Sequence, residues 1–425
     1  MLDLKFIREN SDLVKNKLNL KKAVIDIDHL LEMDEKRRSL IQELQEWKQR
    51  RNELSQQVAS KKKAGEDVSG IINETKELSQ KIKSEDKNLA DIEQEIKEIL
   101  HRIPNLPHDS VPPGTSEDDN VEVERWGELP SFDFPIQDHM EIATRLGLID
   151  FKRGGKISGS GYPVYTSLGA RLERAIINFM LDLHTREHGY EEIFPPFLVN
   201  ADSMFGTGQL PKMADDMYHL QEDDMYLIPT AEVPVTNLHR DEILTADQLP
   251  MKYAAYSACF RREAGSWGKE TRGLLRLHQF NKVELVKFTR PETSYEEHET
   301  LLKDARKVLE LLGLPYRVLS LCSADLSFAA AKCYDLEVWA PAEKMWLEVS
   351  SCSNFEDFQA RRANIRFRPE QNAKPEFVHT LNASGVATPR LMVAILEHYQ
   401  TDEGSVIVPE PLRDYFGASV IKRKL

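Results

Sequence analysis

The side chains best suited to chemistry lie on two predicted strands that flank a polar, glycine-containing loop. The first strand, Met251–Glu263, ends with Arg261 and Glu263, and the second, Leu274–Phe288, carries Phe280. Residues i and i+2 of a strand point to one face of a sheet. There an arginine can neutralise a phosphate, a carboxylate can accept a hydrogen bond from an exocyclic amine, and an aromatic ring can stack on a base. Together these three side chains would hold a nucleotide flat against the sheet.

An arginine and a glutamate at this spacing most often form a cross-strand ion pair, so this pattern alone does not establish a nucleotide site. Two further stretches stand on either side of it: His188-Gly-Tyr190, followed by Pro196, and Leu381-Asn-Ala-Ser-Gly-Val-Ala-Thr-Pro-Arg390. In this order, over about 200 residues, the three stretches resemble the signature motifs of class II aminoacyl-tRNA synthetases. The class I signatures, a His-Ile-Gly-His tetrapeptide and a Lys-Met-Ser-Lys-Ser loop, are absent from the sequence.

A closer resemblance, which extends over essentially all of residues 1–425, is to the seryl-tRNA synthetases. It rests on the N-terminal heptads described below and on five segments: Thr230-Ala-Glu232, Cys259–Ser266, His278–Glu284, Glu348–Asn354 and Leu381–Gly385. The resemblance implies an enzyme that activates L-serine with ATP to seryl-adenylate, releases pyrophosphate, and transfers serine to the 3′ end of tRNA(Ser). It implies that tRNA(Sec) is charged as well.

The resemblance also implies a nucleotide site, residue by residue. Arg261 would contact the α-phosphate and favour the charge that builds in the transition state. Phe280 and Arg390 would hold the adenine ring between them, and Glu263 would accept from its amine. The catalytic residues would be Arg261, Glu348 and Arg390. The whole expected ATP site comprises Arg261, Arg262, Glu263, Leu277, Phe280, Glu348, Val349, Ser350, Ser351 and Arg390.

A second set of residues would hold serine by its ammonium and hydroxyl groups. The anionic Glu232 and Glu284 suit both groups, and a site that pairs the hydroxyl would reject alanine because a buried polar group would lose its partner. Without the resemblance, Thr230 could simply cap the start of a helix. The expected serine site comprises Thr230, Ala231, Glu232, Glu284, Asn382 and Ser384.

Metal binding is expected only through ATP. Glu348 and Ser351 offer the oxygen ligands that Mg²⁺ prefers, so the resemblance implies an ion that bridges the phosphates there. Glu348 could otherwise be an ordinary strand carboxylate. No zinc is expected, and a reduced, cytoplasmic protein fits best, because there is no Cys-x-x-Cys spacing among Cys259, Cys322, Cys333 and Cys352.

The elements that position these residues begin with a heptad repeat in the first hundred residues. Met33, Leu40, Trp47 and Leu54 are spaced by seven, and so are Thr75, Ile82, Leu89, Ile96 and Ile103. Such seams predict two helices that pack on each other. The glycine-containing break at Lys63–Gly70 joins them into an antiparallel coiled-coil hairpin, about 30–103, with arms of roughly 45 Å.

The charge distribution makes this hairpin the expected tRNA-binding element. The chain carries a net charge of -14, yet residues 36–63 hold nine Lys and Arg against three Asp and Glu. A solvated helix face explains such a run at least as well. With the resemblance, it indicates contacts to tRNA phosphates, recognised by shape, through Arg37, Arg38, Arg50 and Arg51.

The expected architecture is α+β, with the antiparallel β-sheet of class II synthetases flanked by helices after an N-terminal coiled-coil arm. The expected domains are residues 1–103, which bind tRNA, a linker at 104–125, and a catalytic domain at 126–425. The first signature motif implies a homodimer. No membrane partner is expected, because no apolar run approaches the roughly 18 residues that a span needs.

Three alternatives share some of these features: a carrier-protein aminoacylating homologue, a class II synthetase for another amino acid, and a non-enzymatic coiled-coil protein. The long arm speaks against the first. The chain ends soon after Arg390, without the anticodon domain that follows the catalytic part in the threonine and proline enzymes. The third would not need the nucleotide residues. Pyrophosphate exchange with each amino acid would separate all three from the main hypothesis.

Overall fold

The computed structural model describes residues 1–264 and 272–423, so the end of the Cys259–Ser266 segment lies outside the described residues. The chain divides into two compact units. One consists of Leu2–Pro104, and the other of Met1 and Asn105–Leu425. In the described part of the chain, no helix is both long and apolar enough to cross a bilayer. All four cysteines are free and buried.

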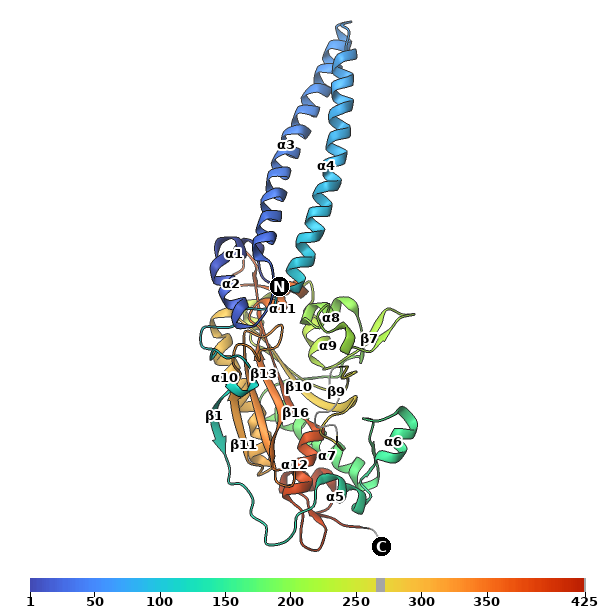
Figure 1. Cartoon of the computed structure of the whole chain (residues 1–425), viewed down its shortest axis with the longest axis vertical. Coiled ribbons are helices and arrows are strands. Elements are labelled where there is room, and N and C mark those ends of the chain that lie inside the picture. Colours follow the sequence, from blue (N-terminus) through green and yellow to red (C-terminus); the bar gives the residue numbers. More distant parts are fainter. Residues whose placement is uncertain (265–271, 424–425) are drawn as a thin grey trace. The chain divides into compact units, whose positions relative to one another are not determined.

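The first unit is built around two long helices that run side by side as a hairpin (Figure 1). Asp26 caps α3 by accepting from the backbone N–H of His29 at 2.9 Å. Gly65, with φ of +77°, allows the turn between the two long helices. The predicted antiparallel hairpin is thereby confirmed. The helices of this unit are α1 (Leu4–Glu9), α2 (Ser11–Leu20), α3 (Ile27–Lys63) and α4 (Ser69–Arg102).

The heptad positions meet between α3 and α4, as the spacing predicts. Leu40 and Leu44 of α3 form a cluster with Ile82 of α4. Trp47 packs against this cluster, and the ammonium of Lys81 lies 3.9 Å from the centre of its ring. The arm therefore has its own apolar seam, and its remaining faces are polar.

The second unit is organised by an eight-stranded sheet. Its strand order is β1-β11-β12-β13-β16-β10-β9-β4, and its described neighbours are antiparallel except for the parallel pair β4 and β9. The strands, in that order, are Val121–Trp126, Tyr316–Ser320, Lys332–Ala340, Met345–Asn354, His379–Ala387, Gln279–Thr289, Met251–Phe260 and Glu191–Ile193. The α+β prediction with an antiparallel sheet is thus confirmed.

Alternation along the central strands divides the sheet into two faces. Leu285 of β10 belongs to a large hydrophobic cluster with α7 (Ser167–Arg186), α10 (Ser294–Leu311) and α12 (Thr388–His398). Val286 and Phe288 of the same strand belong to a second hydrophobic cluster. That cluster includes residues of α9 (Glu232–Thr236), α11 (Phe358–Ala363), β8 (Ile243–Thr245), β14 (Arg366–Arg368) and β15 (Glu376–Phe377).

Shorter elements complete the second unit. The helices are α5 (His139–Leu146), α6 (Phe151–Ser158), α8 (Ala201–Thr207) and α13 (Arg413–Phe416). The strands are β2 (Ile149–Asp150), β3 (Val164–Tyr165), β5 (Leu198–Asn200), β6 (His219–Leu220), β7 (Met225–Leu227), β17 (Val406–Ile407) and β18 (Val420–Ile421).

The bounds of both expected strands differ from those in the structure. The strand expected at Leu274–Phe288 is β10, which begins at Gln279 and ends at Thr289. The strand expected at Met251–Glu263 ends at Phe260, and Glu263 has a left-handed φ of +52°. Arg261 and Glu263 therefore lie on the turn that follows β9 rather than on the strand. The segment expected as a linker packs along the second unit, where the side chain of Asn105 donates to Ala329 O at 2.9 Å and to Phe355 O at 2.8 Å.

Candidate active site

A cavity of about 780 Å³ opens over the centre of the large sheet. That volume is typical of small-molecule and cofactor sites. Strands β10, β13 and β16, the turn after β9 and the start of α12 all contribute to its wall. Most of the residues expected at a site line it: Thr230, Glu232, Arg261, Glu263, Leu277, Phe280, Glu348, Val349, Ser351, Asn382, Ser384 and Arg390.

Four expected residues do not form the wall. Ala231 is buried in the hydrophobic cluster beneath α9, and the side chain of Arg262 is exposed. Ser350 is buried and donates to Ser384 O at 2.6 Å. Glu284 lies just behind the wall, fully buried, and is held by Thr230 and Asn382, which do line it.

At one end of the cavity, cationic and aromatic groups gather. The guanidinium of Arg261 lies 5.1 Å from the centre of the Phe280 ring, within cation–π range. Arg390 donates to Leu275 O at 3.2 Å and to Glu348 O at 2.7 Å. A guanidinium group beside an aromatic ring, with a second guanidinium group on the same cavity wall, suits a polyanion that carries a planar base.

Glu263 forms an ion pair with a partner that the sequence reading missed. Arg276 donates to Glu263 Oε2 at 2.6 Å from the other side of the loop. The ion pair that the Arg-x-Glu pattern suggested does exist, but its arginine is Arg276 rather than Arg261. The pair fixes the carboxylate at the cavity wall.

At the other end lie two buried carboxylates. Asn382 Nδ2 donates to Glu232 Oε2 at 3.1 Å and to Glu284 Oε1 at 2.9 Å. Thr230 donates to Glu284 Oε2 at 3.0 Å, and Lys282 forms a close ion pair with the same carboxylate. Burial, followed by the nearby charge of Glu284, raises the pKa of Glu232 to about 7. This end suits a small cation that carries a hydroxyl group.

Lys282 and Gln359 were absent from the expected site, although both contact its carboxylates. The signal for Lys282 was present, because it stands between Phe280 and Glu284 at the spacing that places all three on one face of β10. Gln359 of α11 donates to Glu232 Oε1 at 2.6 Å. No local pattern marks it, because 127 residues separate it from its partner.

The oxygen ligands expected for a metal lie on β13. The side chain of Glu348 is 46% exposed at the cavity wall, and Ser351 Oγ lies 3.1 Å from Cys333 Sγ. Asp335 stands opposite Ser351 in the β12–β13 register. Burial, and then the charge of Glu348, raises the pKa of Asp335 well above its usual range. Hard oxygen donors next to a polyanion site fit a Mg²⁺ ion held mainly by phosphates.

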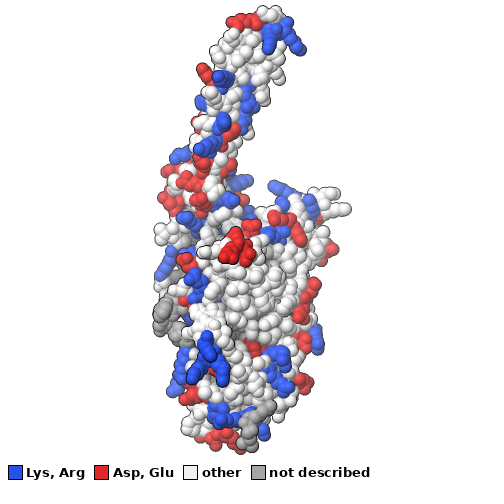
Figure 2. All heavy atoms as spheres, turned by 90° about the vertical axis from the view of Figure 1, so that its right-hand side faces the viewer, with Lys and Arg blue, Asp and Glu red and all other residues white. Residues whose placement is uncertain are grey.

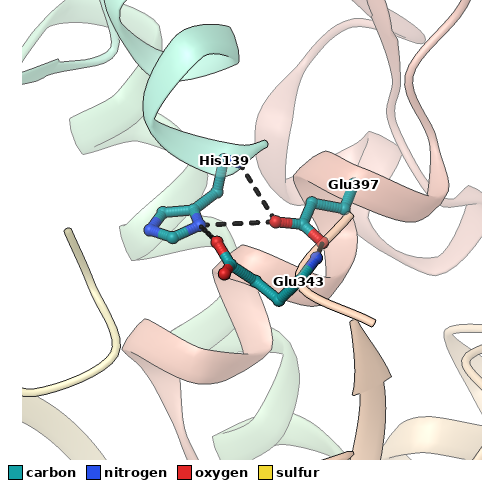
Figure 3. Close-up of side chains that lie close together, drawn as sticks. All are labelled: His139, Glu343 and Glu397. Carbon is teal, nitrogen blue, oxygen red and sulfur yellow. Dashed lines mark hydrogen bonds and ion pairs between the residues drawn. The ribbon is translucent and has the colours of Figure 1, made fainter. Parts of the chain in front are cut away.

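Elsewhere among the described residues, one group has the composition of a transition-metal site. It comprises His139, Glu343 and Glu397, with ligand atoms within 4.8 Å of one another (Figure 3). Its hydrogen bonds argue against metal binding. His139 Nε2 accepts from Leu274 N–H at 3.3 Å, so the ring proton is on Nδ1, which faces the two carboxylates. A protonated Nδ1 donates and cannot ligate.

The four arm arginines expected to contact tRNA differ in their surroundings. Arg37 and Arg38 both bind the carboxylate of Asp34, at 2.8 and 3.2 Å, and that carboxylate is fully buried. Arg50 lies 3.1 Å from Glu74 across the hairpin. No ion pair forms with Arg51 among the described residues. Figure 2 shows basic and acidic side chains interspersed along the arm, with both kinds at its tip. The last turn of α3 carries Lys61–Lys63.

Known proteins share both units. A family model described as the seryl-tRNA synthetase N-terminal domain matches residues 1–107. A second, described as the tRNA synthetase class II core domain (G, H, P, S and T), matches residues 217–399. Together they account for the arm and for the part of the chain that builds most of the cavity.

Relatives that match over the whole chain support the same family as the two family models. The serine–tRNA ligase of Carboxydothermus hydrogenoformans is 56% identical over 424 residues, which cover 100% of both chains. The crystal structure of seryl-tRNA synthetase from Pyrococcus horikoshii complexed with ATP superposes with a TM-score of 0.94 at 36% identity and covers 100% of both chains. The cytoplasmic serine–tRNA ligase of Naegleria fowleri in complex with AMP gives a TM-score of 0.88 at 30% identity, covering 100% of this chain and 99% of that one. The chain therefore belongs to the seryl-tRNA synthetase family, whose members are class II serine–tRNA ligases.

Proposed function

We propose that the chain joins serine to tRNA(Ser) in two steps, through a seryl-adenylate formed in the cavity over the large sheet. The observation that carries this proposal is the pairing of two different environments in one cavity. Arg261 and Phe280 lie at one end, and the carboxylates of Glu232 and Glu284 lie at the other. The first end suits ATP, which is the ligand of the Pyrococcus horikoshii relative. The second suits the ammonium and hydroxyl groups of serine.

In the first step, the serine carboxylate attacks the α-phosphate of ATP in line, and pyrophosphate leaves. Arg261 neutralises the charge that builds on the phosphate, while Phe280 and Arg390 hold the adenine between them. Glu263, oriented by Arg276, accepts from the adenine amine. Mg²⁺, held by Glu348 and Ser351 together with the phosphates, would lower their negative charge.

In the second step, the terminal ribose hydroxyl of the tRNA attacks the activated carbonyl, and AMP leaves. The buried carboxylates hold the ammonium throughout, so the reacting carbonyl stays in place. No side chain of the cavity is assigned as a general base. Catalysis by positioning and charge neutralisation is sufficient for a leaving group as good as AMP.

Serine selectivity follows from the second end of the cavity. The oxygens of Glu232 and Glu284 accept from Asn382, Thr230, Lys282 and Gln359. Each carboxylate oxygen can accept a second hydrogen bond, so the serine hydroxyl can join this network, and alanine would forgo that bond. Threonine would be rejected sterically by its extra methyl group, which is the weaker discrimination.

Serine-dependent ATP–pyrophosphate exchange, repeated with threonine and alanine, tests the proposal directly. We expect exchange with serine and at least 100-fold less with alanine, as for other sites that pair a substrate hydroxyl (roughly 10⁴ where pairing is complete). Exchange with another amino acid would assign the chain to a different class II specificity. No exchange with any amino acid would overturn the enzymatic proposal.

We further propose a division of labour along the chain. Residues 1–103 bind the long arm of tRNA(Ser) and, by the same contacts, tRNA(Sec); residues 104–125 connect them to the catalytic part, 126–425. The protein works as a cytoplasmic homodimer. Support for the dimer comes from the edge strand β4, after which Phe194 is 75% exposed and Leu198 is 40% exposed. Sedimentation analysis, and charging assays with each of the two tRNAs, test these points.

A further inference from the structure

His139 connects two carboxylates, one fully buried and one partly exposed, to the wall of the nucleotide cavity. It is the first residue of α5, whose N-cap is Asp138, and its side chain is completely buried. Nδ1 lies 3.3 Å from Oε1 of Glu397 on α12 and 3.2 Å from Oε1 of Glu343 in the turn between β12 and β13. Figure 3 shows the imidazole reaching from its helix to both carboxylates.

Glu397 itself is held by three backbone N–H groups from two segments. Its Oε1 accepts from His139 N–H at 3.1 Å, and its Oε2 accepts from Ala342 N–H at 2.9 Å and Glu343 N–H at 3.4 Å. Because several donors bind it, this carboxylate is fixed in position. The imidazole that donates to it is therefore locked in both orientation and tautomer.

The opposite edge of the imidazole faces the segment that returns from the β9–β10 loop. His139 Nε2 accepts from the backbone N–H of Leu274 at 3.3 Å. A Cβ atom on Gly273 would lie 2.2 Å from the same Nε2, so the backbone passes directly against the ring. One residue earlier, Arg272 forms a 2.7 Å ion pair with Asp138. Asp138 and His139, which are adjacent at the start of α5, thus contact the three successive residues 272–274.

The segment held in this way is part of the nucleotide cavity. Leu274, Leu275, Arg276 and Leu277 all line it. The carbonyl of Leu275 accepts from Arg390 Nε at 3.2 Å, and Arg276 orients Glu263. A shift of Leu274 would therefore move the two groups to which we assign adenine binding.

We propose that His139 is a positioning residue for ATP: through its Nε2 it fixes the 274–277 wall and, with it, Arg390 and Glu263. This inference rests on the proposed nucleotide site. It assigns the His139–Glu343–Glu397 group to hydrogen bonding rather than to a metal. The role belongs to one nitrogen, since Nδ1 serves only to lock the ring against Glu397.

Two substitutions separate the two nitrogens. In His139→Asn the amide can still donate to Glu397 from near the Nδ1 position, but nothing reaches Leu274. In His139→Gln the longer side chain can place an acceptor near the Nε2 position. We expect His139→Asn to raise KM for ATP about three- to tenfold, the value of one net hydrogen bond, with KM for serine unchanged. His139→Gln should restore most of the ATP affinity.

Glycine substitutions provide a second, independent comparison. Gly273 and Gly147 have nearly the same φ, +64° and +63°, but a Cβ atom at Gly147 would meet nothing within 4 Å. Alanine therefore imposes similar backbone strain at both positions, and only Gly273→Ala collides with His139. We expect Gly273→Ala to raise KM for ATP more than His139→Asn does, and Gly147→Ala to leave it within about twofold, because no clash adds to the strain.

The measurements are KM for ATP, KM for serine and kcat in pyrophosphate exchange by the full-length protein, with Tm and metal content on the same samples. The proposal is overturned if His139→Asn and His139→Gln behave alike, or if ATP and serine parameters change together in proportion to Tm. It is also overturned if the wild type retains one equivalent of zinc that His139→Asn loses. Wild-type exchange that persists alongside any of these results leaves the proposed function standing, whereas a wild type without exchange would reject that function itself.

Discussion

Glu232 and Glu284 come from different elements, α9 and β10, yet share one donor, the side-chain amide of Asn382. Two carboxylates this close in a buried site repel each other when both are charged. Lys282 pairs closely with Glu284 alone, so the two acids are not equivalent. The arrangement leaves Glu232 as the acid whose charge depends on pH near neutrality.

The first prediction concerns this pH dependence. With a pKa near 7, Glu232 is largely protonated at pH 6 and largely ionised at pH 8. The ionised form binds an ammonium group, so KM for serine should fall as pH rises across this range. Glu232→Gln should show a higher KM for serine that no longer changes with pH. A wild-type KM that is flat between pH 6 and 8 would contradict the assignment.

The same shift has an opposite effect on folding. The pKa of Glu232 is higher in the folded protein than its ordinary value of 4.5, so the folded state holds the proton more tightly than the unfolded state. Its contribution to stability is fully present below pH 4.5 and is lost as pH rises through 7. In Glu232→Gln, the free energy of unfolding should therefore fall less between pH 5 and 8 than in the wild type, by urea titration.

The second prediction separates serine from ATP. Glu284→Ala removes the acceptor of Thr230 and Asn382 and the ion partner of Lys282, all at the serine end of the cavity. We expect serine activation to lose about 2–4 kcal/mol, with a much smaller change in KM for ATP. Steady-state exchange kinetics with each substrate varied in turn measure both. A raised KM for ATP with serine unaffected would reverse the assignment of the two ends.

The third prediction compares two adjacent arginines. Arg261 lies over Phe280 at the cavity wall, whereas the side chain of Arg262 is exposed away from it. Arg261→Ala should lower the exchange rate roughly 10²–10³-fold, the usual cost of losing a preorganised charge stabiliser. Arg262→Ala is the matched control and should stay within about threefold, as surface substitutions usually do. Equal losses in the two variants would show that Arg261 acts only through local structure.

The fourth prediction divides the basic residues of the arm. Arg37 binds the buried carboxylate of Asp34, so Arg37→Ala should destabilise the N-terminal unit by about 1–3 kcal/mol. Arg51→Ala, and Lys62 with Lys63 changed to Ala, should leave stability unchanged and weaken tRNA binding. Loss of phosphate contacts should also flatten the salt dependence of tRNA affinity. Filter binding at several salt concentrations, with thermal unfolding of the same variants, measures both effects.

Much of the fold was predictable because its longest elements have clean periodicity. The heptads of α3 and α4 are local, and local patterns survive tertiary packing. The end of β9 was not predictable. Glu263 adopts a left-handed φ, for which glutamate has no intrinsic preference, so the surroundings rather than the residue determine the turn.

The cavity residues show the same limit at longer range. Motifs identified Arg261, Phe280 and Glu284, because each stands in a recognisable stretch. Gln359 could not be identified, since its contact with Glu232 depends on the docking of α11. For Arg37 and Arg38 a signal did exist. Asp34 precedes them by three and four residues, the spacing of helical ion pairs, and counting charges alone overlooked it.

Strand β10 carries Phe280, Lys282 and Glu284 at alternate positions, and its rise of about 3.3 Å per residue places the two ends of this series roughly 13 Å apart. In the proposed binding mode, the strand therefore sets a fixed distance between the nucleotide and the amino acid. Inserting one residue after Lys282 would turn Glu284 to the opposite face. Inserting two residues would restore the face but increase the separation between Phe280 and this glutamate by about 7 Å. Such an enzyme would still hold ATP and serine separately, yet the carboxylate and the α-phosphate would no longer meet.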